Sequence, residues 1–183
     1  MRSAEGYRAG GTRRGGTAGT FEIREDQVVA NIEMIRPYVE KKVAEYLGAE
    51  SVKTNPDGSI PIRFGSTACI VNLVEGPSGP MMRVFSPFLQ EVDKTNELLE
   101  KLNELNSTAP YVRFFWLERS VYCSVDIIAT DLETGEIANA LSAVAWHADN
   151  FDEQLVKEFG GKRVFEESAD EQKAPEAGSG QYL

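Results

Sequence analysis

The apolar spacing between residues 137 and 161 constrains the fold of this chain more than any other stretch. Apolar side chains recur there every three or four residues, which keeps them on one face of an α-helix. They are Ile137, Leu141, Val144, Ala148, Phe151, Leu155 and Phe159. Gly160 and Gly161 follow, and a glycine just past the last apolar position is typical of a helix end. The stretch therefore predicts a long helix whose buried face anchors a domain.

The length of 183 residues fits one domain of ordinary size with tails. Residues 1–22 are rich in Gly and Arg and hold almost nothing large to bury, so they predict a disordered leader. The domain is expected over residues 23–162. Residues 163–183 combine acidic residues with Ala, Gly and Ser, which predicts a disordered acidic tail.

The charge of the chain is unevenly distributed. The net charge is −10, with +3 on residues 1–20 and −2 on residues 161–183, which leaves −11 on residues 21–160. A surface of this sign repels phosphate backbones and disfavours a nucleic-acid role. The leader contains only four arginines, which favours a flexible leader over an RNA-binding segment.

The sequence also bears on the compartment. It contains no apolar run of about 18 residues, and no apolar segment follows the basic residues near the N-terminus, so we expect neither a membrane span nor a signal peptide. Cys69 and Cys123 lack the paired spacing of zinc or redox motifs and fall in strand-like runs, which favours reduced core residues. These features predict a cytoplasmic protein without a metal or other cofactor.

Two shorter helical patterns precede the long one. From Glu25 to Leu47 the apolar residues keep a helical period, and Pro37 inside it predicts a kink or a fresh helix start. A second helix is expected through about Leu105, with Asp93 as its N-terminal cap.

Strand-like segments lie between these helices. Asn55 to Gly58 has strong turn chemistry and predicts a hairpin between Val52–Thr54 and Ser59–Phe64. Gly65 predicts a bulge or bend, after which a more fully apolar strand continues from Thr67 to Val74. Further strands are expected at 81–88, 111–117 and 121–129, the last two forming a hairpin.

The order of elements is helix, antiparallel strands, helix, hairpin, helix. It predicts an α+β fold in which the helices pack on one face of a single antiparallel sheet.

In this order the chain resembles the type III secretion chaperone fold shared with YbjN-type proteins, including actinobacterial peptide-binding chaperone-like members. The resemblance is carried by residues 98–106 (LLEKLNELN), by residues 148–152 (ADNFD), by Leu155 and by residues 159–161 (FGG). It covers roughly residues 25–161. It implies a small cytosolic protein that holds an extended or helical segment of a client protein, often as a homodimer, and hydrolyses nothing.

Alternation along the strands defines a candidate peptide-binding face. If the apolar alternation of each strand points to the core, the opposite face presents Arg63, Arg83, Phe85, Arg113, Phe115, Tyr122 and Asp126. Three arginines and three aromatic residues suit an acidic, partly apolar peptide. The competing interpretation is that these arginines only pair with Asp126, Glu118 or other acids across the strands of a solvated face.

Other candidate sites have weaker support. His147 is the only histidine and lies beside the apolar stripe of the long helix, so helix packing is its expected role. Asp149, Asn150 and Asp152 lack the ligand order of a calcium loop. No carboxylate pair or nucleophile motif points to catalysis.

Three classes of function remain open. The sequence favours a non-enzymatic peptide-binding chaperone or adaptor. A regulatory, signal-transducing interaction domain is the alternative, and a small enzyme or a nucleic-acid binder is disfavoured. The expected partner is a client protein or peptide, with no nucleic acid and no membrane, and a homodimer is implied by the resemblance alone.

Overall fold

The structure is a computed structural model that describes residues 25–64, 67–77, 79–164 and 181–182; for residues 25–31 and 181–182 it describes the backbone alone. The predicted leader and most of the predicted acidic tail lie outside these residues. The described elements, in chain order, are α1 (Glu25–Leu47), β1 (Ile60–Phe64), β2 (Thr67–Gly76), β3 (Gly79–Gln90), α2 (Asn96–Thr108), β4 (Arg113–Leu117), β5 (Ser120–Ile128), α3 (Thr134–Phe159), β6 (Lys162–Arg163) and β7 (Gln181–Tyr182).

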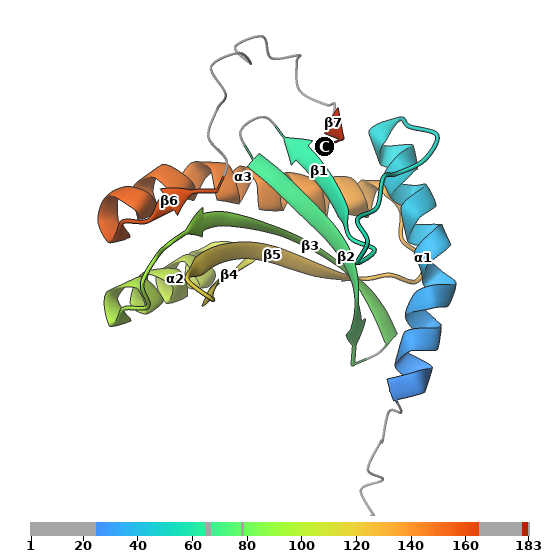
Figure 1. Cartoon of the computed structure of the whole chain (residues 1–183), viewed down its shortest axis with the longest axis horizontal. Helices are drawn as coiled ribbons and strands as arrows, with labels where there is room; N and C mark the ends of the chain where they lie inside the picture. The colour runs from blue at the N-terminus through green and yellow to red at the C-terminus, as the bar shows by residue number, and fades with distance from the viewer. Residues whose placement is uncertain (1–24, 65–66, 78, 165–180, 183) are drawn as a thin grey trace, which may run out of the picture.

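The strands form one antiparallel sheet in the order β4-β5-β3-β2-β1-β7, and β6 pairs with β3 outside this path. The long strand β3 lies at the centre and pairs with both β2 and β5. Figure 1 shows α3 crossing the strands, α1 beside β1 and β2, and α2 near β4. The predicted α+β fold with helices on one sheet face is confirmed.

The core lies between the helices and the inner face of the sheet. The long helix predicted from the apolar stripe is confirmed as α3, which buries Ile137, Leu141, Val144, Ala148 and Leu155. It begins three residues earlier than its first apolar position, at Thr134. The carboxylate of Glu136 accepts a hydrogen bond from the N–H of Glu133 at 3.0 Å, which satisfies a backbone donor at this helix end.

The predicted hairpin at Asn55–Gly58 is wrong, because residues 52–54 form no strand. The turn instead connects α1 to β1, where the N–H of Asn55 donates to the carbonyl of Ser59 and the carboxylate of Asp57 accepts from the N–H of Ser59. Only one of residues 52–54 is apolar, so this short run has little to bury against the sheet.

Gly65, where a bulge or bend is predicted, lies outside the described residues, and the strand predicted after it is present as β2. β1 and β2 are separate strands that run antiparallel, with Phe64 opposite Thr67, so the chain reverses between them. A strand that continued past residue 65 would have left β1 without this partner.

The cap of α2 differs from the expectation as well. Thr95 is the N-cap, and its hydroxyl accepts a hydrogen bond from the N–H of Leu98 at 3.1 Å. Asp93 instead forms an ion pair with Arg119. Asp93 and Thr95 are both residue types that can cap a helix. Thr95 is the cap because it directly precedes the first helical residue, Asn96.

A partly buried ion pair joins α3 to β6. Asp152 on α3 is 4% exposed and accepts a hydrogen bond from Nε of Arg163 on β6 at 2.7 Å. The composition predicted disorder over residues 163–183, but β6 extends to the first of these residues and β7 lies within the segment. The chain beyond α3 therefore returns to the sheet at two places.

Candidate peptide-binding face

The face of the sheet opposite the helices is here called the open face. Strand register places the outward side chains in rows, because Arg83 lies opposite Asp126, Phe85 opposite Ser124 and Phe115 opposite Tyr122. Outward side chains also come from β2 and β1. The face consists of Arg113, Phe115 and Leu117; Tyr122, Ser124, Asp126 and Ile128; Met81, Arg83, Phe85 and Pro87; Ile70, Asn72 and Val74; Pro61 and Arg63.

Two arginines converge on one carboxylate at the centre of this face. Arg83 donates to Asp126 through Nε at 2.7 Å and Nη2 at 2.8 Å. Arg113 donates to Asp126 through Nη2 at 2.7 Å and to the hydroxyl of Ser124 through Nε at 2.8 Å. The three charged side chains leave one net positive charge in the group. The cross-strand pairing of the competing interpretation is thus present for Arg83 and Arg113.

The environment of Asp126 favours its ionised form. Burial raises the pKa of this carboxyl, but the hydrogen bonds from Arg83 and the charges of Arg113 and Arg83 outweigh burial and hold the pKa below its ordinary value. At neutral pH this carboxylate is charged and accepts hydrogen bonds from both arginines.

An aromatic cluster borders the charged group. Phe115 and Tyr122 stack with ring centroids 5.2 Å apart and an interplanar angle of 7°, and Phe85 lies 6.4 Å from Tyr122. The guanidinium carbon of Arg113 lies 5.8 Å from the centroid of Phe115, within cation–π range. The charged group and the aromatic cluster therefore form one continuous surface across β3, β5 and β4.

Arg63 is separated from this cluster. It lies on β1 opposite Ala68, so β2 stands between it and the strand that carries Arg83 and Phe85. Six of the seven predicted site residues are thus brought together, and Arg63 faces the same side near the edge of the sheet.

The open face also has apolar residues outside the predicted site. Leu117 is 50% exposed and Ile128 is 58% exposed, at the ends of β4 and β5. Ile70, Met81 and Pro87 are half-buried on the same side. Their alternation with the core residues was visible in the sequence, and their exposure depends on which strands lie beside them.

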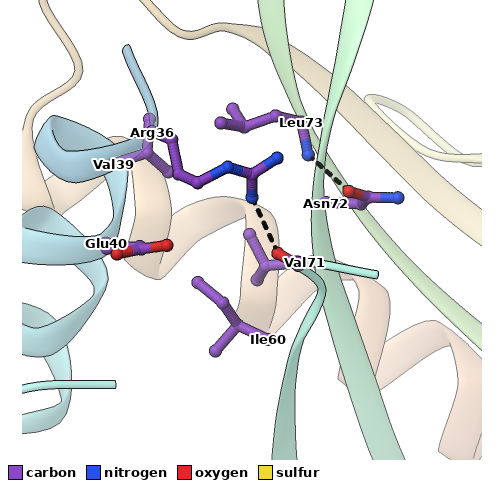
Figure 2. Close-up of a pocket in the computed structure, with 8 residues that line it drawn as sticks. Arg36, Val39, Glu40, Ile60, Val71, Asn72 and Leu73 are labelled. Carbon is purple, nitrogen blue, oxygen red and sulfur yellow. Dashed lines mark hydrogen bonds between the residues drawn. The ribbon is translucent and has the colours of Figure 1, made fainter. Parts of the chain in front are cut away.

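The pocket between α1 and the β1–β2 pair is too small to bind a ligand. Figure 2 shows Arg36 reaching across it to donate to the carbonyl of Gly58 at 3.0 Å. The cavity is about 10 Å³, room for about one water molecule. It is lined by Arg36, Val39, Glu40, Gly58, Ile60, Val71, Asn72 and Leu73.

The single histidine, on α3, packs against β4 and against its own helix. His147 lies against Phe114 at 5.8 Å and against Phe151 at 6.2 Å between ring centroids, and Nδ1 is 2.7 Å from the carbonyl of Ala143. Trp146 beside it is 59% exposed on α3.

The cysteines and carboxylates of the described chain form no metal site. Burial raises the pKa of the Cys69 thiol and raises that of Cys123 to about 12, so both thiols are protonated at neutral pH. Residues 25–64, 67–77, 79–164 and 181–182 contain no group of three or more His, Cys, Asp or Glu side chains placed to hold a metal ion. No helix in these ranges has the length and apolar character needed to cross a membrane.

The family model TY-Chap1, described as T3SS (YopN, CesT) and YbjN peptide-binding chaperone 1, matches residues 33–167. Because the match spans more than half of the chain, the chain belongs to this family of peptide-binding chaperones. A comparison with curated proteins found no significant match.

Two solved structures have a similar fold. The ExsC-ExsE complex has a TM-score of 0.51 and 15% identity, covering 68% of this chain and 95% of that chain. The HopA1-SchA chaperone-effector complex has a TM-score of 0.52 and 10% identity, covering 68% of this chain and 97% of that chain. At these identities the likeness establishes the fold alone.

Proposed function

We propose that this protein is a non-enzymatic, chaperone-like adaptor that holds an acidic, partly apolar segment of a client protein on its open face. The proposal includes a cytoplasmic location, no cofactor, and no nucleic-acid or membrane partner. The observation that carries it is the convergence of Arg83 and Arg113 beside the stacked rings of Phe115 and Tyr122, in a chain of net charge −10.

The charged group suits a client carboxylate. Arg113 is 52% exposed and uses only Nε and Nη2 for Ser124 and Asp126, so an acidic side chain can approach its guanidinium from the solvent side. A carboxylate placed there would share the arginine with Asp126, and the net positive charge of the group favours this.

The aromatic cluster suits the apolar part of the client. Stacked rings present a rigid surface that loses little conformational entropy on binding, and aromatic and arginine side chains are enriched among the residues that dominate binding energy. Leu117 and Ile128 extend the apolar surface to both ends of the β4–β5 pair.

The charge of the rest of the protein adds specificity. A basic peptide would be attracted to the acidic surface elsewhere, whereas an acidic peptide finds a positive counterpart in the group of Arg83, Arg113 and Asp126. The acidic character of the client is therefore the most distinctive part of the proposal.

The experiment is a selection of peptides from a random dodecapeptide library displayed on phage, with the full chain as bait. Acidic residues next to aromatic or aliphatic ones are expected to be enriched, and synthetic versions should bind at least ten times more tightly than versions with Lys in place of Asp and Glu. Enrichment of basic peptides, or equal affinity for acidic and Lys-substituted versions, would contradict the proposal.

Sedimentation of the purified full chain decides between a monomer and the homodimer that the resemblance implies.

A further inference from the structure

The carboxylate of Asp126 is shared by the two arginines of the open face. Its Oδ1 accepts a hydrogen bond from Nε of Arg83 at 2.7 Å, and its Oδ2 accepts one from Nη2 of Arg83 at 2.8 Å and one from Nη2 of Arg113 at 2.7 Å. The Asp126 side chain is 18% exposed, whereas the side chains of Arg83 and Arg113 are 36% and 52% exposed. A client therefore meets the guanidinium groups first, with the less exposed carboxylate beside them.

Both arginines retain hydrogen-bond donors for a client. Arg113 donates through Nε to the buried hydroxyl of Ser124 and through Nη2 to Asp126. Arg83 donates through Nε and Nη2 to Asp126. Within the described part of the chain, Nη1 of neither arginine donates a hydrogen bond. Since a guanidinium group has several N–H donors, each arginine can still bind an oxygen atom that approaches from the solvent side.

The net charge that a client meets at this group is set by Asp126. Asp126 is the only carboxylate that the described strands place on the open face, and with the two arginines it leaves one net positive charge. Asn72, opposite Arg83 on β2, is uncharged, and Arg63 lies on β1, beyond β2. Removal of the Asp126 charge would therefore double the positive charge at the site.

Two kinds of anionic side chain match this charge differently. A carboxylate of Asp or Glu carries one negative charge and neutralises the group. A phosphorylated Ser, Thr or Tyr carries a charge of about −1.5 to −2 at pH 7, so it leaves a negative excess beside the ionised Asp126. Like charges a few ångströms apart on a partly exposed face repel each other, which disfavours the phosphate.

We propose that Asp126 is a specificity-determining residue, which makes the open face accept a client carboxylate and reject a phosphate group. This inference rests on the proposed peptide-binding function and names the anionic group that the client presents. Two arginines that converge beside aromatic rings otherwise suit a phosphate, because guanidinium groups bind phosphate oxygens through paired donors. Asp126 engages the paired donors of Arg83 and adds a negative charge between the two guanidinium groups.

Three substitutions separate the charge of Asp126 from its shape. Asp126→Asn keeps the shape of the side chain and one acceptor oxygen, and it removes the negative charge. Asp126→Glu keeps the negative charge at the same position. Asp93→Asn is the matched control, because it changes the net charge of the chain by the same amount at an exposed ion pair with Arg119, outside the strands of the open face.

The test compares three forms of one acidic dodecapeptide selected from the library. The acidic position whose replacement by Ala weakens binding most carries Glu, Gln or phosphoserine, and the affinity of each fluorescein-labelled form for the full chain is measured by anisotropy at neutral pH. The wild type should bind the Glu form at least about five times more tightly than the other two forms, and Asp126→Asn should instead prefer the phosphoserine form. Asp126→Glu and Asp93→Asn should keep the wild-type order.

Three results would overturn the inference. They are a preference of the wild type for phosphoserine, the same order of affinities in the wild type and in Asp126→Asn, and a reversed order in Asp93→Asn. A failed inference with tight binding of the Glu form to the wild type would leave the proposed function standing.

Titration with sodium phosphate gives a readout that needs no peptide. The Nε–H resonances of Arg83 and Arg113 are followed by NMR in the full chain at constant ionic strength, with sodium acetate as the control anion. Phosphate at about 50 mM should shift these resonances in Asp126→Asn and leave them unchanged in the wild type. Equal shifts in the two proteins would overturn the inference. If the library yields no acidic peptide, the proposed function fails, and this titration still tests the role of Asp126.

Discussion

Arg83 holds the carboxylate of Asp126 with two nitrogen atoms at once, Nε at 2.7 Å and Nη2 at 2.8 Å, from directly opposite positions on β3 and β5. Arg113 reaches the same carboxylate from β4, so three strands are joined through one side chain. Asp126 therefore has a structural role on the open face and also sets the orientation of both arginines.

Replacing Asp126 with Asn should destabilise the fold at neutral pH by about 1 kcal/mol, because the arginines lose a charged acceptor on a partly exposed face. The folded pKa of Asp126 lies below its unfolded value, so its contribution is present above the unfolded pKa and is lost as pH falls through the folded pKa. Urea unfolding of the wild type and Asp126→Asn should differ at pH 7 and converge toward pH 2. A constant difference across this range would contradict the assignment.

The ion pair between Asp152 on α3 and Arg163 on β6 should respond to pH in the opposite sense. Burial raises the pKa of Asp152, and the hydrogen bond from the N–H of Glu153 and the charge of Arg163 offset this only in part. An acid with a raised folded pKa loses stability as pH rises through the window from its unfolded to its folded pKa. The stability of the fold with Asp152 ionised therefore depends on the positive charge of Arg163.

Arg163→Met removes this counter-charge while it keeps much of the side-chain volume. We expect a loss of roughly 2 kcal/mol at pH 7 and a smaller loss at pH 4, because a protonated Asp152 needs no partner charge. Asp152→Asn is the matched control and should show a weaker pH dependence. Urea titrations at both pH values measure the effect, and a larger loss at pH 4 than at pH 7 would refute it.

The backbone of the turn between β4 and β5 is strained, because both of its residues are non-glycine residues with positive φ angles. Glu118 and Arg119 have φ angles of 47° and 62°, and Leu117 lies opposite Ser120, so both turn residues adopt the left-handed conformation. Asparagine tolerates this conformation far better than a β-branched residue does. Glu118→Asn should raise the unfolding free energy by about 0.5 kcal/mol. Glu118→Val should lower it, and calorimetric melting of the two variants measures the order.

The glycines that end α3 are predicted to differ in their tolerance. A Cβ at Gly161 would lie 2.5 Å from Cγ2 of Val92 and 2.6 Å from the carbonyl oxygen of Gln90, whereas a Cβ at Gly160 has no atom within 4 Å. Both residues have positive φ angles, so Gly160→Ala should cost about 1 to 3 kcal/mol from backbone strain. Gly161→Ala should cost more because the backbone of β3 must also move. Equal melting temperatures would contradict the contact.

The main elements of the fold were predictable because their signals are local. The apolar stripe from Ile137 to Phe159 sets the buried face of α3, and the alternation from Val121 to Ala129 sets the two faces of β5. The outward positions of Arg83, Phe85 and Tyr122 followed from alternation alone. Register then brought six of the seven predicted residues together.

The errors concern choices that depend on distant partners. Turn residues at Asn55–Gly58 indicate a reversal and cannot indicate whether a strand or a helix precedes it. The use of Thr95 as a cap, and of Asp93 as a partner for Arg119, depends on where the β4–β5 turn lies. The pairing of β7 with β1 joins residues about 120 positions apart by only two residues, too few to produce a periodic signal.

The central claim is that the client lies on the open face, and its most direct test is the affinity of one selected acidic dodecapeptide for three variants. Phe115→Ala removes half of the aromatic stack, and Arg83→Ala with Phe115→Ala also removes the guanidinium. Trp146→Ala truncates a more exposed aromatic residue, on α3 in the helical layer. The account predicts at least ten-fold weaker binding for Phe115→Ala, a further loss for the double variant, and wild-type affinity for Trp146→Ala. Unchanged affinity in the double variant, with a loss in Trp146→Ala, would contradict it.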